Sequence, residues 1–214
     1  MNFKDNVNFG SNIFSIEQFA MYASGGAWIP FRHLILVCEI LMYVIQGRLS
    51  RVMIFMPPRH GKSELISYYF LTWLFGYFPD THVILATHSA RFSRKWGRRV
   101  RNLLKKIGDN VFPEPVIISQ DSQAADIWDI ENHKGGLVTN GVGGAILGEG
   151  ANGFIIDDPT KGFKKARSKT HQQELNDWWF TEAKTRLNAD IENGHKPWVI
   201  GIWQRLNIDD LAGQ

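Results

Sequence analysis

The chain has 214 residues, of which 44% are hydrophobic, 13% aromatic and 21% charged, and its formal net charge is +3. This composition excludes an intrinsically disordered chain, because so many apolar side chains can bury enough surface to offset the entropy lost on folding. The single cysteine, Cys38, excludes an intramolecular disulfide and a cysteine-based zinc site. The length favours one large α/β domain over two small ones.

We expect neither an export signal nor a membrane-spanning segment. The N-terminal sequence MNFKDNVNFGSN contains charged side chains and lacks the apolar core of a signal peptide. The most hydrophobic run, residues 34–45, is 12 residues long and contains Glu39, whereas a spanning helix needs about 20 apolar residues. This run is therefore expected to form a buried helix in a protein that has no membrane partner.

The pattern of apolar residues predicts strands that alternate with helices. In chain order we expect a short helix and a turn within 15–30, a helix over 31–46, a strand over 52–56, a loop over 57–61, a helix over 63–75, a strand over 82–87, a helix over 90–107, weak strands at 116–118 and 137–139, a strand over 153–157, a helix over 172–188 and a strand over 196–202. The main strands are continuous apolar runs, which predicts a parallel sheet that helices cover on both faces.

The strongest motif is MPPRHGKS, residues 56–63, between a predicted strand and a predicted helix. It matches the phosphate-binding loop except that Met56 replaces the first glycine. Gly61 would let the backbone approach the phosphates, Lys62 can reach the β and γ oxygens, and the Ser63 hydroxyl can ligate Mg²⁺. The alternative is a chance Gly-Lys-Ser, which the strand–loop–helix context disfavours. The expected nucleotide contacts are Pro58, Arg59, His60, Gly61, Lys62, Ser63 and Glu64.

A second motif, FIIDD at residues 154–158, is an apolar strand that ends in two carboxylates. Asp157 is expected to hold the metal ion through water, and Asp158 can act on the attacking water as a general base. The alternative is a turn cap before Pro159. Some 95 positions separate Lys62 from Asp157, with the strand 82–87 between them. This spacing favours P-loop ATPases with an additional strand over small nucleotide kinases.

A third segment, residues 198–205, is a strand followed by Gln204 and Arg205. A polar side chain at the end of such a strand can lie near the γ-phosphate and sense its hydrolysis. The alternative for Gln204 and Arg205 is an ordinary surface position after a buried strand.

The helix expected over 90–107 is strongly basic. Eight Lys or Arg and no acidic residue lie between positions 81 and 108. Helical spacing places a basic stripe, Arg94, Arg98, Arg101 and Lys105, opposite a buried face formed by Phe92, Trp96, Val100, Leu103 and Leu104. The stripe is either a solvated face or a contact for DNA phosphates or a neighbouring subunit's nucleotide. A second basic cluster, Lys161, Lys164, Lys165, Arg167 and Lys169, is predicted to be a loop.

Six segments together resemble a known family. They are GRLSR (47–51), MPPRHGKSE (56–64), ATHSA (86–90), VRNLL (100–104), GEGANGFIIDDPTK (148–161) and QRLNIDDLAG (204–213). In this order they are similar to the ATPase domain of the large terminase subunit of tailed bacteriophages. The resemblance implies an α/β P-loop NTPase fold of the additional-strand type, with a mainly parallel central sheet flanked by helices and a small lid subdomain.

The resemblance also implies a function. It implies an enzyme that hydrolyses ATP, with Mg²⁺, to drive double-stranded viral DNA into a procapsid. The implied partners are the portal protein, the small terminase subunit and further copies of the chain in a ring, although the isolated chain can be monomeric. The implied location is the host cell cytoplasm, at the procapsid portal. A C-terminal RNase H-like nuclease domain is expected in the parent protein, so nuclease activity is not expected here.

Within the chain, the resemblance implies an N-terminal helical or lid segment over 1–46 and an ATPase core over 47–214. A lid helix is expected near 170–190, and the adenine contacts are expected from Phe31, Arg32 and His33.

The chain departs from the family pattern at several sites. Asp158 stands where many relatives have glutamate, and Gln204 stands where threonine is common. Leu147 and Glu149 lie where relatives often carry an arginine. An arginine acting from a neighbouring subunit is therefore expected within the basic stripe, at Arg98 or Arg101, with Arg59 as the arginine of the same chain.

Two other functions remain open. One is another P-loop DNA motor of the helicase or recombinase type, which would separate or exchange strands. The other is a nucleotide-gated DNA-binding module, which would release no phosphate.

Overall fold

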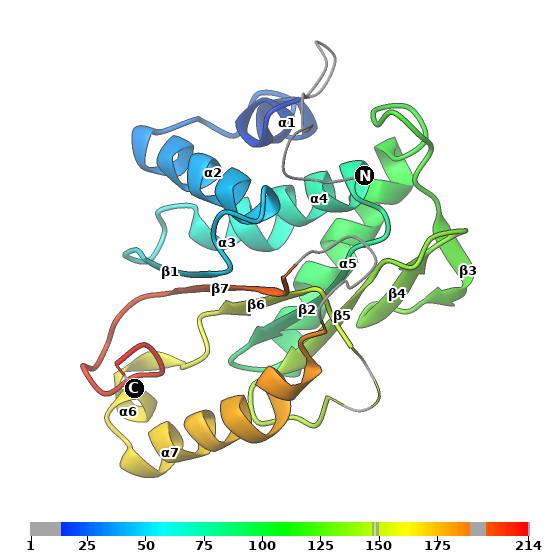
Figure 1. Ribbon diagram of the computed structural model, residues 1–214. Coiled ribbons are helices and arrows are strands. Elements are labelled where there is room, and N and C mark those ends of the chain that lie inside the picture. Colours follow the sequence, from blue (N-terminus) through cyan, green and yellow to red (C-terminus); the bar gives the residue numbers. More distant parts are fainter. Residues whose placement is uncertain (1–13, 147, 149, 189–195, 214) are drawn as a thin grey trace.

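The computed structural model describes residues 14–146, 148, 150–188 and 196–213. Its centre is a seven-stranded sheet in the order β1-β7-β6-β2-β5-β4-β3 (Figure 1). The strands are β1 (Arg51–Phe55), β2 (His82–Thr87), β3 (Ile118–Gln123), β4 (Ile127–Ile130), β5 (Gly136–Gly141), β6 (Gly153–Asp157) and β7 (Trp198–Trp203). Strands β1, β7, β6, β2 and β5 pair in parallel, and β4 and β3 join them antiparallel. The predicted α/β fold with a mainly parallel sheet is confirmed.

Helices cover both faces of the sheet (Figure 1). In chain order they are α1 (Ile16–Ala23), α2 (Arg32–Ile45), α3 (Lys62–Glu64), the π-helical η1 (Leu65–Phe70), α4 (Leu71–Tyr77), α5 (Ala90–Ile107), α6 (Gly162–Ala166), α7 (Lys169–Trp178), the π-helical η2 (Trp179–Ala183) and the 3₁₀ turn η3 (Lys184–Arg186). Elements α3, η1 and α4 follow one another without a break after the phosphate-binding loop. None of the helices in these described ranges is long and apolar enough to cross a membrane.

The alternation of side chains along the strands explains why both faces are covered. In β2, Val83 and Leu85 pack into a core with α1, α2, η1, α4 and α5, whereas Ile84 and Ala86 pack into a second core with α7 and η2. All four side chains are fully buried. A strand with apolar residues on both faces needs such cover, because each face otherwise exposes apolar surface to water.

The strand order brings the candidate site to one edge of the sheet. Strand β7 lies between β1 and β6, whereas β2, which lies between them in the sequence, pairs with the other side of β6. In register, Phe55 of β1 is opposite Trp203, and Asp157 of β6 is opposite Ile202 and Thr87. The phosphate-binding loop, the two aspartates and residue 204 therefore leave the sheet at the same edge.

Three segments differ from the predictions made from sequence. The structure has β3 at 118–123, where 116–118 was predicted, and it adds the four-residue strand β4; five of the six residues of β3 are polar, which masks its strand pattern. The helix predicted over 172–188 begins at Lys169, where Ser168 caps it, and its α-helical part ends at Trp178. The basic cluster predicted as a loop contains α6 and the first turn of α7. The division into lid and core remains a prediction.

Candidate nucleotide-binding site

The phosphate-binding loop occupies residues 56–61, between β1 and α3. Gly61 has φ +82°, and a Cβ atom there would lie 3.2 Å from Leu34 Cδ1. The positive φ favours glycine at this position, and an added methyl group would also require the Leu34 side chain to shift. Arg59 also adopts a positive φ of 63°, which non-glycine residues rarely do outside functional loops. The loop is held internally by His60 Nδ1, which lies 2.8 Å from the Pro58 carbonyl oxygen.

Asp157 is the buried carboxylate of the site. The Ser63 hydroxyl donates to its Oδ1 at 2.9 Å, and the Ser67 hydroxyl donates to its Oδ2 at 2.8 Å. Burial, followed by the charge of Asp158, raises the pKa of Asp157 to about 7 despite these two donors. Within the described part of the chain, the donors to this buried carboxylate are the two hydroxyls, which favours a cation beside it. Hydroxyl and carboxylate oxygens are ligands that Mg²⁺ prefers. The residues present thus fit a bound magnesium ion.

Ser67 was not predicted from the sequence. It lies four residues after Ser63 in the helical stretch α3–η1, so both hydroxyls face the same side and meet the same carboxylate. That spacing was the only signal available, and it has meaning only once the position of Asp157 is known.

Asp158 forms the second half of the site. Its Oδ2 lies 2.7 Å from Lys62 Nζ, and Lys62 is only 7% exposed. Its backbone has a positive φ of 44°. Its N–H donates to the Ile202 carbonyl at 2.9 Å, and its carbonyl accepts from the His88 N–H at 3.2 Å. These bonds to the ends of β7 and β2 hold an uncommon backbone conformation, of the kind that gathers at functional sites.

The predicted adenine contacts lie beside the loop. A cavity of about 500 Å³ is lined by Phe31 and His33 together with loop residues Arg59, His60 and Gly61. The Phe31 and His33 rings are stacked with centroids 5.8 Å apart. Arg32 is not among the lining residues, whereas Trp28 and Tyr69, which the sequence did not single out, are.

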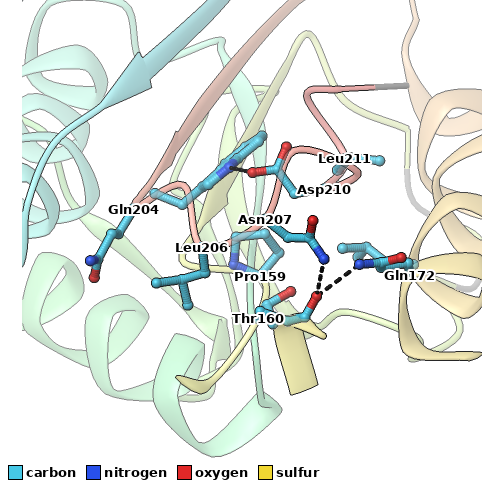
Figure 2. Close-up of a pocket in the computed structure, with 11 residues that line it drawn as sticks. Pro159, Thr160, Gln172, Gln204, Leu206, Asn207, Asp210 and Leu211 are labelled. Atoms are coloured by element: carbon cyan, nitrogen blue, oxygen red, sulfur yellow. Dashed lines mark hydrogen bonds between the residues drawn. The ribbon is translucent and has the colours of Figure 1, made fainter. Parts of the chain in front are cut away.

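The segment after β7 is tied to α6 and α7 (Figure 2). Asn207 Nδ2 and Gln172 Nε2 both donate to the Ala166 carbonyl oxygen, at 2.9 and 2.8 Å. Arg205 Nε donates to Asp210 at 3.1 Å, so this predicted sensor residue is paired within its own segment. The Gln204 side chain points away from the residues around Asn207 (Figure 2).

The four residues of the predicted basic stripe on α5 differ in their partners. Arg94 forms an ion pair with Asp126 at 3.0 Å. Arg101 Nη1 and Lys105 Nζ donate to the carbonyl and side-chain oxygens of Gln123, both at 2.5 Å, and no such bond involves Arg98 in the ranges described above. The buried face is as predicted, except that Phe92 is half-buried.

Arg99, which the sequence did not single out, links α5 to α3 and η1, the helical stretch that follows the phosphate-binding loop. Its Nη2 lies 2.9 Å from Glu64 Oε1, and its guanidinium lies 4.0 Å from the centroid of the Tyr68 ring and 4.7 Å from that of Trp96. Arg99 thereby fixes the side chain of Glu64, which lies in α3 directly after Ser63. Two residues discussed from sequence, Leu147 and Glu149, lie outside the described residues.

Comparison with known proteins finds similarity in structure only. No known sequence family matches the chain, and no curated protein matches it. The large terminase of bacteriophage HK97 matches with a TM-score of 0.55 and 16% identity over 94% of this chain and 38% of that one. Two structures of the large terminase of a thermophilic bacteriophage have TM-scores of 0.42 and 0.46, identities of 15% and 12%, and cover 72% and 80% of this chain and 32% and 38% of theirs. The chain has a large-terminase-like fold.

Proposed function

We propose that the chain is an ATPase that powers the translocation of double-stranded viral DNA into a procapsid. The observation that carries this proposal is that the phosphate-binding loop and the FIIDD motif lie next to each other at the carboxyl ends of the parallel strands. Lys62 and Ser63 of the loop contact Asp158 and Asp157 at 2.7 and 2.9 Å, across the intervening strand β7. The fold shared with a phage large terminase supports the choice of DNA packaging over other ATP-driven tasks.

ATP binding would change the partner of Lys62. The backbone N–H groups of the loop and the start of α3 would bind the phosphates. Lys62 Nζ, now paired with Asp158, would turn to the β- and γ-phosphate oxygens and release the carboxylate. Phe31 and His33 line the cavity beside the loop, and they would contact the adenine.

Ser63 and Asp157 would hold Mg²⁺. When bound, that ion would neutralise charge on the β- and γ-phosphates. The burial of Asp157 and its two hydroxyl donors fix the carboxylate in place before the ion arrives, so little reorganisation is needed on binding.

Asp158 would act as the general base once Lys62 has left it. Its position after β6 and its bonds to Ile202 and His88 aim the carboxylate toward the loop. It would accept a proton from the attacking water, while the water oxygen bonds to the γ-phosphorus and ADP leaves. Arg59, inside the loop, would stabilise the negative charge of the transition state.

Assembly and coupling complete the proposal. The chain would act as a ring at the procapsid portal in the host cell cytoplasm, together with the portal protein and the small terminase subunit. Of the stripe residues, Arg94 and Arg98 would contact DNA, and Arg101 and Lys105 would contact a neighbouring subunit's nucleotide. Gln204 and Arg205 would pass the state of the γ-phosphate to the segment bonded to Ala166.

Phosphate release with Mg²⁺ and ATP tests the proposal. Lys62→Ala should reduce turnover at least 100-fold, because the loop loses its buried cation, and Lys106→Ala, an exposed lysine at the end of α5, should not. Turnover of Lys62→Ala within threefold of the parent chain would refute the loop assignment. A parent chain that binds ATP and releases no phosphate would instead be a nucleotide-gated module, and one that separates DNA strands would be a helicase-type motor.

A further inference from the structure

A hollow of about 510 Å³ lies between the first half of α5 and the segment that follows Asp158. Its lining is dominated by positive charge, from the side chains Arg91, Arg94, Lys95, Arg98 and Lys161. It is separate from the cavity of about 500 Å³ beside the phosphate-binding loop. The hollow also differs from the stripe predicted from sequence, because Arg101 and Lys105 are not among its lining residues.

Most of these cations are available to an anion. Arg94 is paired with Asp126, but in the part of the chain that the structure describes no acidic side chain pairs with Arg91, Lys95, Arg98 or Lys161. All four are exposed. Lys161 also acts together with Lys165 to lower the pKa of His88, although burial is the largest cause of that shift. Like charges held this close repel one another, and an anionic occupant would relieve the repulsion.

The arrangement of the cations suits a row of phosphates. Arg91 and Arg98 are seven residues apart on α5, which corresponds to about 10 Å along the helix. A strand of duplex DNA carries one phosphate per 3.4 Å of axis, so about three phosphates fall within that length. The hollow thus has about as many unpaired cations as a short stretch of one strand has charges.

The hollow also adjoins the candidate ATP site. The N–H of His88, one of its lining residues, donates to the Asp158 carbonyl oxygen at 3.2 Å. Arg99 of α5 is paired with Glu64 at 2.9 Å, and Glu64 directly follows Ser63. The stretch 88–99, which runs from the end of β2 into α5, therefore contacts both Asp158 and Glu64.

We propose that this hollow binds backbone phosphates of duplex DNA, with Arg91, Lys95, Arg98 and Lys161 as the phosphate contacts. The choice of DNA as the occupant rests on the proposed function. Because phosphates carry no sequence information, binding is independent of sequence and weakens with salt.

The test compares the salt dependence of DNA binding in variants that lose the same charge. Fluorescence anisotropy of a labelled 30-bp duplex is measured for the parent chain and for three double variants. Arg91→Gln/Arg98→Gln removes two cations from the hollow, and Arg101→Gln/Lys105→Gln removes two from the rest of the predicted stripe. Lys106→Gln/Lys196→Gln removes two exposed cations elsewhere. Circular dichroism confirms that each variant is folded.

The hollow pair is expected to lower the slope of log K against log salt by roughly 1.8, at about 0.9 per phosphate contact. The other two pairs are expected to change it by less than about 0.5, well under one contact. Equal changes in all three variants, no change in the hollow variant, or no DNA binding by the parent chain would overturn the inference.

Two further measurements separate this inference from its rivals. A fluorescent ATP analogue counts nucleotide sites, and one site per chain is expected. A second site that disappears in Arg91→Gln/Arg98→Gln would assign the hollow to nucleotide phosphates and overturn the inference. Phosphate release is measured separately, so DNA binding through the hollow without ATP hydrolysis would refute the proposed function alone.

Discussion

The pairing of Lys62 with Asp158 predicts an unusual result for Asp158→Asn. The Lys62 ammonium lies 2.7 Å from the carboxylate that would activate water. ATP must therefore compete with Asp158 for this lysine. The asparagine variant keeps the size of the side chain and removes its charge. We expect it to bind Mg·ATP more tightly than the parent chain while it loses turnover.

The size of the effect follows from the exposure of the pair. A hydrogen bond to a charged group contributes about 1.5–3 kcal/mol, and an exposed ion pair about 0.2–1 kcal/mol. The side chains of Lys62 and Asp158 are 8% and 34% exposed, so the pair lies between these cases, at about 1–2 kcal/mol. Its removal should lower the Kd for nucleotide roughly 5- to 30-fold, and loss of the base should lower turnover about 10²- to 10⁴-fold.

Calorimetric titration with a non-hydrolysable ATP analogue and Mg²⁺ measures the affinity, and phosphate release measures turnover. Asp121→Asn, which removes the same charge from an exposed position on β3, serves as the control and should change neither. Asp157→Asn should weaken the binding of Mg·ATP, because it removes the buried carboxylate. An unchanged or higher Kd for Asp158→Asn would refute the exchange of partners, and turnover within threefold of the parent chain would refute its role as base.

Two further substitutions test how the loop is held. Gly61→Ala should destabilise the fold by more than the roughly 1–2 kcal/mol that a left-handed alanine costs, because the added methyl group contacts Leu34, and it should also weaken ATP binding. Urea unfolding measures the loss of stability. The control is Gly143→Ala, because Gly143 has φ +79° and no atom near the position of an added methyl group. Arg99→Gln should lower the free energy of unfolding by about 1–2 kcal/mol, because it removes the ion pair with Glu64 and the contacts with two aromatic rings, and it should weaken ATP binding. Arg48→Gln, which removes the contact of Arg48 with the Tyr43 ring, should lower the stability without changing ATP binding. Equal ATP affinity in both arginine variants would contradict the positioning role of Arg99.

The elements that the sequence predicts well are strands with apolar residues on both faces and the loop that has a local motif. Strand β2 (HVILAT) and the strand part of FIIDD are continuous apolar runs, and the structure buries both on two faces. The phosphate-binding loop can be recognised in the sequence because glycine, lysine and serine each have a different chemical role in binding phosphate and Mg²⁺. Strands β3 and β4 were harder to predict, since five of the six residues of ISQDSQ are polar and β4 is only four residues long.

The contacts around the site could not be predicted in the same way. Nothing local in the sequence indicates that β7 inserts between β1 and β6, because strand order depends on packing across the whole sheet. The roles of Ser67 and Arg99 follow only from that order, since their partners lie 90 and 35 positions away. The positive φ of Asp158 has a weak signal, because aspartate tolerates this conformation better than most residues.

The two hydrogen bonds at the Ala166 carbonyl allow a last test, of whether ATP binding and hydrolysis change the conformation of α7 through this contact. The Ala166 carbonyl at the end of α6 accepts from Gln172 of α7 and from Asn207 of the segment that carries Gln204 (Figure 2). Asn207→Ala removes the bond between the two segments but leaves the carbonyl paired with Gln172, so the stability cost should be only about 0.5–1.5 kcal/mol. Gln172→Ala is the matched control, because it removes a bond of the same kind within one segment.

Hydrogen exchange of the amides in residues 162–178 reads the effect of nucleotide on this region. In the parent chain, binding of an ATP analogue should change their exchange rates. Asn207→Ala should abolish that nucleotide dependence and raise exchange in both states, since α6 loses its hydrogen bond to the segment after β7. Gln172→Ala should raise exchange but keep the dependence. If both variants respond to nucleotide like the parent chain, the signal does not pass through the Ala166 carbonyl, and the contact between His88 and Asp158 becomes the next one to test.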